Sequence, residues 1–178
     1  QSRLSVFARR AEDLPAGAGV VSYLADFMLP HKEPAIEQVR RLHAECRTVL
    51  LIAANFFDAF AGNPQHALEA LRAARAAGAS ALILEDTRGG VLPSRLGLVC
   101  QTLRELIDAP LGIRARNDCG VAVANTLAAV EAGFAWVAGA VNGYGERCGA
   151  ANLCTVLADV ELKLGLEAVG RDALQRLG

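Results

Sequence analysis

Hydrophobic residues occur along this chain in short runs rich in Val, Leu and Ile, and longer segments separate these runs. In the longer segments the apolar residues recur at the spacing of one helix face, whereas the short runs are typical of strands. The runs predict strands over residues 4–8, 20–24, 49–53, 81–85, 111–115 and 136–140. The longer segments predict helices over residues 33–46, 64–77, 93–107, 121–132 and 152–163. Strand and helix therefore alternate, with a repeat of about 30 residues, the length of one βα unit.

Glycine, proline and asparagine mark the ends of several predicted helices. Gly78 and Gly133 each follow a helical segment, at the position where a left-handed cap is common. Asn63 and Pro64 are typical of an N-cap followed by the first helical turn. Because the strand runs are almost continuously apolar, they indicate parallel strands covered on both faces. We therefore expect an α/β protein.

Regular βα units build either a doubly wound open sheet or a (β/α)8 barrel. No GxGxxG motif follows the first predicted strand, which weakens the dinucleotide-binding form of the open sheet. The stretches NFFD, EDTRGG, RND and NGYGERCG each follow a strand, at the end where barrel enzymes build their sites. A complete barrel has eight strands and about 250 residues, whereas this chain has 178 residues and predicts about six strands. We expect one incomplete domain over residues 1–178, a partial or shortened (β/α)8 TIM barrel with outer helices.

Composition and charge narrow the function without identifying it. The chain is 53% hydrophobic and carries 18 basic and 19 acidic residues, for a net charge of -1. The basic residues are scattered, so we expect no surface for nucleic acid or an anionic membrane. No apolar run approaches the roughly 20 residues that span a bilayer, and no secretory signal opens the chain. These features favour a folded cytoplasmic protein.

Neither the cysteines nor the histidines form a recognisable metal motif. The five cysteines are an odd number without a CxxC pair, so we expect reduced thiols, most of them small buried residues. The three histidines have no partners at ligand spacing and are expected at the surface. These residues are Cys46, Cys100, Cys119, Cys148 and Cys154, and His31, His43 and His66.

Four longer stretches carry a family resemblance: NFFDAFAGNPQHALEALRAARAAGA, EDTRGGVLP, NDCGVAVANTLAAVEAG and VNGYGERCGAANLC. In this order they resemble the second part of the catalytic barrel of the citramalate synthase family. The relatives of that family are 2-isopropylmalate synthase, homocitrate synthase and 3-hydroxy-3-methylglutaryl-CoA lyase. The resemblance extends over about residues 49–164, and residues 1–48 match loosely as shortened third and fourth βα units. We expect no counterpart of the C-terminal regulatory domain that many synthases carry.

The resemblance implies an acyltransferase reaction. In the family a divalent metal such as Mg²⁺ or Mn²⁺ holds a 2-oxo acid such as pyruvate and polarises its ketone. A base removes a proton from acetyl-CoA, and the resulting enolate attacks that ketone. The family also forms dimers, which implies a homodimer for this chain.

The residues that the resemblance would assign to this chemistry are replaced. The two His of an HxH metal motif align with Arg114 and Arg116, and a ligand Asn aligns with Ala150. A Glu-His pair, whose Glu is the expected acid/base residue, aligns with Ala54 and Asn55. The metal-binding Asp of the first strand has no counterpart. Because Arg has no free lone pair and stays protonated, we expect no metal cofactor and no confident catalytic residue.

Arg114 and Arg116 emerge on one face of their strand, because strand side chains alternate with period 2. Three interpretations of this pair remain open. The guanidinium groups could fill the former metal position and pair with acidic neighbours, hold a carboxylate or phosphate anion bidentately, or lie exposed in an open site. The acidic candidates are Glu85, Asp86, Asp118 and Glu146.

Several loop residues are further candidates. Thr87 matches the family residue whose hydroxyl helps to hold the 2-oxo acid carboxylate, but it could equally form a loop hydrogen bond. Asn117, with Asp118, could contact an anion, but we favour a role in tying its loop to the next helix. The aromatic residues Trp136, Phe56 and Phe57 are expected in the core.

The glycine-rich loop could serve as tight turns or present free amides to an anion or a CoA phosphate. A salt bridge within the loop between Glu146 and Arg147 is expected. A nucleophilic Cys148 is not favoured, because no neighbouring His would lower its pKa. The loop residues concerned are Gly143, Gly145, Glu146, Arg147, Cys148 and Gly149.

Two functional hypotheses follow. The first is a catalytically inactive relative of citramalate or 2-isopropylmalate synthase that acts as a partner or regulatory subunit, or binds a small carboxylate or phosphate. The second is an active acyl-CoA-dependent synthase or lyase whose metal site another chain completes. The replaced ligands favour the first. Because a partial barrel leaves open sheet edges, we expect a second copy or a complementary chain to cover them.

Overall fold

The computed structural model describes residues 6–8, 19–29, 31, 33–45 and 48–174. Its strands form one parallel sheet in chain order, from β1 to β6, so each strand pairs with the next strand along the chain. The strands are β1 Val6–Ala8, β2 Val20–Asp26, β3 Thr48–Ala54, β4 Ala79–Asp86, β5 Leu111–Ala115 and β6 Trp136–Ala138. The predicted α/β class and six parallel strands are confirmed.

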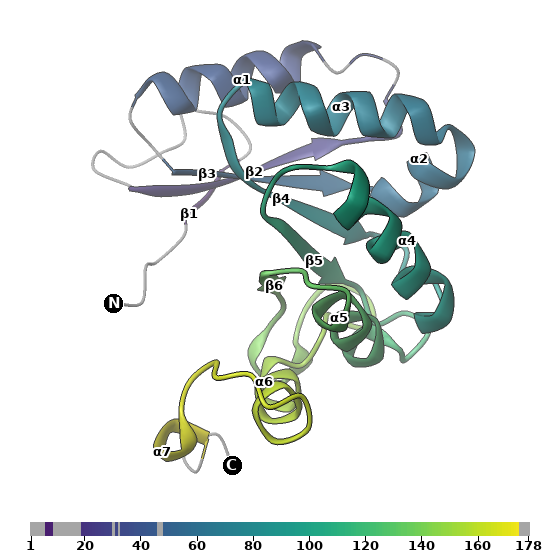
Figure 1. Ribbon diagram of the computed structural model, residues 1–178, viewed down its shortest axis with the longest axis vertical. Helices are drawn as coiled ribbons and strands as arrows, with labels where there is room; N and C mark the ends of the chain where they lie inside the picture. Colours follow the sequence, from purple (N-terminus) through teal and green to yellow (C-terminus); the bar gives the residue numbers. More distant parts are fainter. Residues whose placement is uncertain (1–5, 9–18, 30, 32, 46–47, 175–178) are drawn as a thin grey trace.

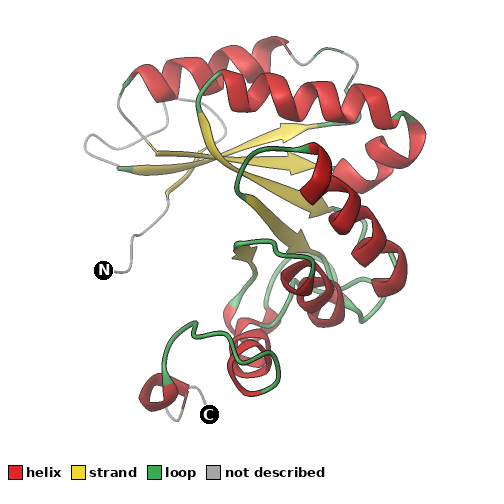
Figure 2. Ribbon diagram, viewed as in Figure 1, coloured by secondary structure: helices red, strands yellow, loops and turns green. Residues whose placement is uncertain are grey.

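The helices follow the strands as the pattern predicts, and they form an arc along one face of the curved sheet (Figures 1 and 2). The opposite face of the sheet is concave, and the short helix over residues 171–174 lies apart from the arc. The main helices are α1 Glu33–Ala44, α2 Phe56–Gly62, α3 Pro64–Ala76, α4 Pro93–Leu106, α5 Ala122–Glu131 and α6 Leu153–Leu162. Two short helices, η2 Val141–Gly143 and α7 Arg171–Leu174, complete the described elements.

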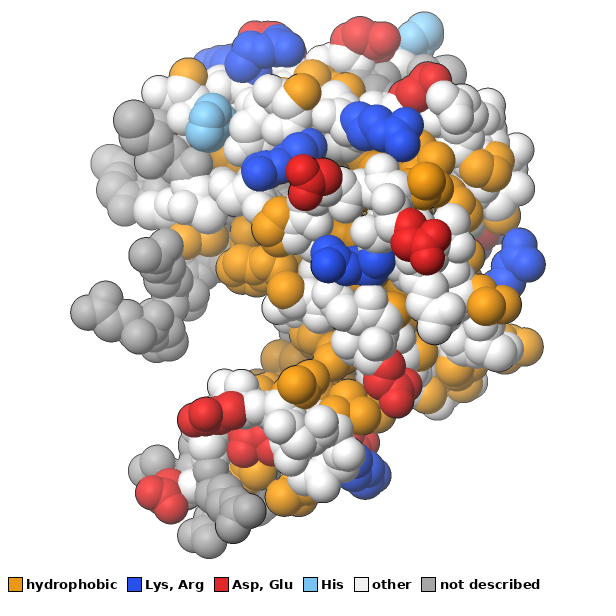
Figure 3. Space-filling view, viewed as in Figure 1, with side chains coloured by type: hydrophobic (Ala, Val, Ile, Leu, Met, Phe, Trp, Pro, Cys, Tyr) orange, Lys and Arg blue, Asp and Glu red, His pale blue; other side chains and the backbone are white. Residues whose placement is uncertain are grey.

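Alternating side chains along the strands build two hydrophobic clusters. The larger one lies between the sheet and the helices and includes Val49 and Leu51 of β3 and Leu82 of β4. The smaller one lies on the concave face, and consists of Val20, Leu50, Ile52, Ala81 and Ile83. Figure 3 shows hydrophobic side chains gathered on the hollowed side of the molecule. The concave face is therefore apolar up to the carboxyl ends of the strands.

The predicted cap residues are confirmed, and the element ends differ by one or two residues. Gly78 and Gly133 have φ angles of 107° and 88°, as left-handed caps require. The Asn63 side chain accepts a hydrogen bond from the His66 backbone N–H at 3.1 Å, which caps α3. The ends predicted at residues 4 and 46 lie outside the described residues. Helix α2 was not predicted, because its seven residues are too few to show a clear period.

The prediction of three core aromatics is right for Phe56 and Phe57 and wrong for Trp136. Phe56 and Phe57 are buried, and their rings meet edge to face with centroids 5.6 Å apart. Trp136 is 42% exposed, because β6 is the last strand in the described sheet and no other described strand covers it.

The prediction that most cysteines are buried is also wrong for the described residues. Cys100 on α4 is buried, and burial raises the pKa of its thiol to about 12. Cys119 and Cys148 are exposed on loops, and Cys154 is half-buried. Cys46 lies outside the described residues.

Among the described helices, none combines the length and the hydrophobicity that a bilayer crossing demands.

Candidate functional site

Parallel strands bring their carboxyl ends to one edge of the sheet, and polar residues meet there around a hollow of about 310 Å³. We call this space the rim hollow. Asp26 closes β2, Asn55 follows β3, and Glu85 lies near the end of β4. The hollow is lined by Leu24, Asp26, Ala54, Asn55, Glu85, Thr87, Arg114, Arg116 and Glu146. The predicted convergence of the strand ends on one site is therefore confirmed.

Four charged side chains of the rim hollow form a continuous row, which we call the charge row: Glu146, Arg116, Glu85 and Arg114. Arg116 donates from Nε to Glu85 Oε1 at 3.2 Å and from Nη2 to Glu146 Oε2 at 3.0 Å. Arg114 Nε lies 3.5 Å from the same Glu85 oxygen. Glu85 is 1% exposed, so its charge depends on these two partners. Opposite charges therefore alternate along the row.

The charge row confirms pairing of the arginines with Glu85 and Glu146, and it corrects the other two candidates. Asp86 points away from the row and accepts backbone N–H groups from Gly90 and Val91 at 3.3 and 3.2 Å. Burial raises the pKa of Asp86, and these two hydrogen bonds oppose that effect. Asp118 pairs with Arg147 instead, through Nε at 2.6 Å and Nη2 at 2.8 Å.

A second set of hydrogen bonds connects the loops along the rim, and we call it the rim chain: Asp118, Arg147, Thr87, Asn55 and Asp26. Arg147 Nη2 also donates to the Thr87 carbonyl at 2.6 Å. The Thr87 hydroxyl accepts the Asn55 backbone N–H at 2.7 Å, and Asn55 Nδ2 donates to Asp26 Oδ1 at 2.9 Å. The rim chain thus joins the loops after five strands.

The two central donors of the rim chain have unusual backbone conformations. Asn55 and Arg147 both have a φ angle of 56°, in the left-handed region that few residues other than Gly adopt. At Arg147 this conformation directs the side chain to Asp118, while Glu146 pairs with Arg116. The expected salt bridge between Glu146 and Arg147 is therefore wrong. The guanidinium of Arg147 lowers the pKa of Asp118 through its hydrogen bonds and its charge.

The glycine-rich loop after β6 packs tightly against itself. A Cβ at Gly149 would overlap with the carbonyl oxygen of Gly143, and Gly149 N–H donates to the Glu146 carbonyl at 3.0 Å. Gly143 itself has a φ angle of 72°. Tight turning is therefore the role of these glycines that the contacts support, whereas anion binding by their amides stays a prediction. The expectation that Cys148 is not a nucleophile also stays a prediction.

Asn117 ties its loop to the next helix, as expected, because its side-chain oxygen accepts the Ala122 N–H at 3.1 Å. It does not line the rim hollow. Thr87 does line it, and its hydroxyl makes the loop hydrogen bond that was one of its two expected roles. Sequence reasoning missed Asp26, although this residue continues the alternation of Val20 and Leu24 along β2.

A second hollow of about 350 Å³ lies deeper, on the concave face of the sheet, and we call it the inner hollow. Among the described residues, the charged ones that line it are Arg114 and Arg116, which line both hollows. Ala150 also lines it and forms an isolated bridge with Arg116. The residues that line the inner hollow are Ser22, Ile52, Arg114, Arg116, Ala138, Gly139, Ala140, Tyr144, Gly145 and Ala150.

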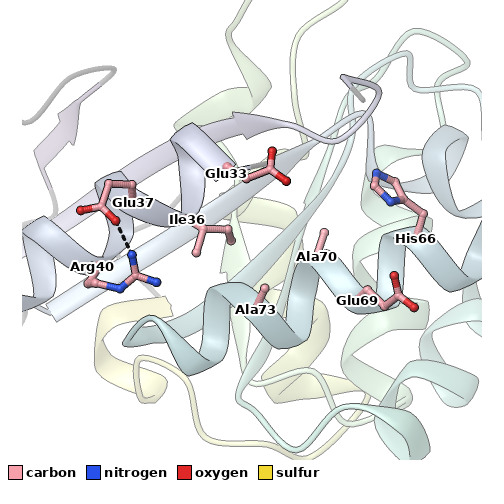
Figure 4. Close-up of a pocket in the computed structure, with 8 residues that line it drawn as sticks. All are labelled: Glu33, Ile36, Glu37, Arg40, His66, Glu69, Ala70 and Ala73. Atoms are coloured by element: carbon pink, nitrogen blue, oxygen red, sulfur yellow. Dashed lines mark hydrogen bonds and ion pairs between the residues drawn. The ribbon is translucent and has the colours of Figure 1, made fainter. Parts of the chain in front are cut away.

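A groove of about 490 Å³ lies elsewhere, on the outer surface between α1 and α3. Figure 4 shows Glu37 paired with Arg40 on α1, and His66 and Glu69 on α3 across the groove. Neither the rim hollow nor the inner hollow shares a lining residue with it. Its lining residues are Glu33, Ile36, Glu37, Arg40, His66, Glu69, Ala70 and Ala73.

The family model described as HMGL-like matches residues 28–173. This chain belongs to the HMGL-like family. The (R)-citramalate synthase of Geobacter sulfurreducens is 41% identical over 145 residues, which are 82% of this chain and 28% of that protein. The (R)-citramalate synthase of Streptomyces coelicolor is 39% identical over 188 residues, which cover 96% of this chain and 35% of that protein. The chain therefore spans only about a third of the length of these HMGL-like relatives.

A solved structure supports the fold of this HMGL-like chain. The HMG-CoA lyase of Bacillus subtilis matches with a TM-score of 0.74 and 16% sequence identity, over 97% of this chain and 73% of that one. The predicted partial (β/α)8 barrel and the resemblance to the citramalate synthase family are confirmed. At 16% identity, the similarity to the HMG-CoA lyase structure concerns the fold alone.

The residues of this HMGL-like chain do not fit a divalent metal at the expected place. Arg114, Arg116, Ala150 and Ala54 occupy the positions that the resemblance assigns to metal ligands and to the acid/base Glu, and they converge on the two hollows. Two guanidinium groups and two methyl groups offer a hard cation no oxygen or nitrogen donor. Within the described ranges, no three His, Cys, Asp or Glu side chains form a group that could hold a metal ion.

Proposed function

We propose that this chain is a metal-independent member of the HMGL-like family that does not itself condense acetyl-CoA with a 2-oxo acid. It acts instead as a partner or regulatory subunit that can bind a small anion. One observation carries the proposal: the charge row, with Arg114 and Arg116, stands where the resemblance places two metal-binding histidines. A buried guanidinium repels a divalent cation and has no lone pair to offer it.

The energetic consequence is large. A Lewis-acid metal supplies several kcal/mol of transition-state stabilisation, and a well-placed acid/base group contributes about 10²- to 10⁴-fold in rate. Ala54 stands where the resemblance places the acid/base Glu, and its methyl group can transfer no proton. Loss of both contributions reduces the condensation to nearly the uncatalysed rate.

Two measurements on the purified chain test the proposal. Calorimetric titration with Mn²⁺ should show no stoichiometric binding. Release of CoA from acetyl-CoA and pyruvate, with Mg²⁺ or Mn²⁺ present, should stay at background and be unaffected by EDTA. The (R)-citramalate synthase of Geobacter sulfurreducens, assayed in parallel, is the positive control. Release of CoA that EDTA abolishes would overturn the proposal.

The open sheet supports the partner role. Strand β6 has three residues and β1 forms the opposite end of the strand order, so each presents an edge without a neighbouring strand among the described residues. Unpaired backbone N–H and C=O groups at such edges favour the addition of another chain. The edge is covered by a second copy or by a complementary segment that completes the barrel.

The same open edges favour one alternative function, an active synthase or lyase whose metal site another chain completes. In that case Mn²⁺ binding and release of CoA would both appear only in the assembled complex. Size-exclusion chromatography separates the assembled complex from the free chain. Measurement of Mn²⁺ binding and of CoA release in both fractions distinguishes this alternative from the metal-independent partner.

A further inference from the structure

The charge row begins with a carboxylate and ends with a cation. Glu146 and Glu85 both contact Arg116, whereas Arg114 has only Glu85, at 3.5 Å, through an oxygen that already accepts Arg116 Nε at 3.2 Å. The Arg114 side chain is 25% exposed. The part of the chain that the structure describes gives its two terminal nitrogens no hydrogen-bond partner. A partly buried guanidinium whose terminal donors face an open hollow can bind an anion.

The surroundings of Arg114 indicate on which side an anion would bind. The rim hollow already contains the carboxylates of Asp26, Glu85 and Glu146, which repel a further negative charge. Among the described residues, no carboxylate lines the inner hollow, and the charged residues that line it are Arg114 and Arg116. An anion is therefore favoured in the inner hollow.

We propose that the inner hollow binds a short aliphatic monocarboxylate, with its carboxylate on the terminal nitrogens of Arg114 and its hydrocarbon tail against Ile52 and Ala138. Two parallel N–H groups of a guanidinium match the two oxygens of a carboxylate. One added negative charge beside Arg114 continues the alternation of charges along the row. A dianion would add a second negative charge that no cation of the row balances.

The size and lining of the inner hollow determine which hydrocarbon tail fits. Its volume of about 350 Å³ is at the small end of ligand cavities, which span about 300–1,000 Å³. Beyond the arginines its lining includes Ile52 and the methyl groups of Ala138, Ala140 and Ala150. A tail of a few carbon atoms gains from contact with these groups. This inference rests on the anion-binding part of the proposed function, and it does not depend on whether the chain also catalyses a reaction.

Calorimetric titration of the purified chain with acetate, propionate and butyrate tests the proposal, with inorganic phosphate as the competing anion. We expect one site, with affinity rising up to about fourfold for each added methylene, the ratio that burial of one CH₂ gives. Binding of phosphate more tightly than butyrate, or no binding of any of the three acids at millimolar concentration, would overturn the proposal.

Variants test the role of Arg114. Arg114→Gln should weaken butyrate binding about tenfold or more, because it removes a charge-assisted bidentate contact. Arg95→Gln, at an exposed position on α4, is the matched control and should leave the affinity unchanged. Equal effects of the two variants would contradict a specific site.

A third variant keeps the test decisive if Arg114→Gln fails to fold. Glu146 is 74% exposed, so Glu146→Gln should fold normally. It removes a negative charge from Arg116 and should tighten butyrate binding, while weaker or equal binding would count against the charge argument. Binding of butyrate together with EDTA-sensitive release of CoA would refute only the metal-independent function.

Discussion

Glu85 is the residue on which the charge row depends, because one of its carboxylate oxygens contacts both arginines. It is 1% exposed, and the side chain of Arg116 is 10% exposed. A buried carboxylate that holds two cations is a point where a small chemical change has a large effect on stability.

We predict that Glu85→Gln lowers the free energy of unfolding by about 3–5 kcal/mol, the usual result of removing one partner of a buried ion pair. Urea denaturation measures the change. Glu105→Gln, at an exposed position on α4, is the control and should stay within about 0.5 kcal/mol of the original chain. A loss as small as that of the control would mean that water, rather than Glu85, satisfies the arginines.

The pair of Asp118 and Arg147 predicts how the stability of the fold changes at low pH. Because Arg147 lowers the pKa of Asp118 below its ordinary value of 3.8, the folded protein binds this proton less readily than the unfolded chain. The pair therefore stabilises the fold above that ordinary value, and the stabilisation is lost as the pH falls through the lowered pKa. Arg147→Gln should raise the NMR titration midpoint of the Asp118 carboxyl group, whereas Arg88→Gln should not. Identical midpoints in all three proteins would contradict this assignment.

At the residue scale, the sequence predicts contacts within regular strands better than contacts between loops. Period-2 alternation correctly places Arg114 and Arg116 on one face, and Glu85 on the neighbouring strand β4 contacts both. The partner of Arg147 depends on a left-handed backbone angle that its sequence does not determine. The pairing of Glu146 with Arg147 was wrong for this reason.

At the scale of elements, β5 and β6 lie close together because a glycine faces β6. A Cβ at Gly112 would lie 2.5 Å from Ile83 Cδ1 and 2.6 Å from Trp136 Cβ. No side chain fits there unless a strand moves. The close approach of backbone to neighbouring side chains is the usual reason for Gly inside a strand.

We predict that Gly112→Ala lowers the free energy of unfolding by about 1–3 kcal/mol, through overpacking between β5 and β6. Gly97→Ala is the matched control, because its Cβ would lie 3.8 Å from the Ala128 side chain, in ordinary contact. Gly97 is inside α4, so Ala there should stabilise by about 0.5–1 kcal/mol. Thermal unfolding of both variants gives the comparison, and equal shifts of the same sign would refute the packing argument.

The elements themselves were largely predictable, because each long helix has a clear apolar period and each buried strand is a short, almost continuous apolar run. Helix α2 was not predictable, because it has only seven residues and begins within the NFFD stretch after β3. The exposure of Trp136 was not predictable either, since it depends on the position of β6 at the end of the sheet rather than on the residues around it.

At the scale of the whole molecule, the open sheet predicts association. We expect light scattering to give a mass above that of the monomer, and Trp136→Arg to reduce it, because a charge at the exposed edge opposes the addition of another strand. Leu98→Arg is the control, since Leu98 is 61% exposed on α4, in the arc of outer helices. A monomeric original chain, or equal masses for both variants, would contradict closure at this edge.

The rim chain has a consequence for how the molecule opens. Its hydrogen bonds run from Asp118 through Arg147 and Thr87 to Asn55 and Asp26, and the Met28 N–H also donates to Asp26 at 2.9 Å. A loop that swings outward must break bonds held by its neighbours. Under native conditions the amide protons of Asn55 and Met28 should therefore exchange with solvent deuterium at a common opening free energy, as one cooperative unit. Arg147→Gln should accelerate both exchanges together, because the loops then open as one unit and not independently of one another.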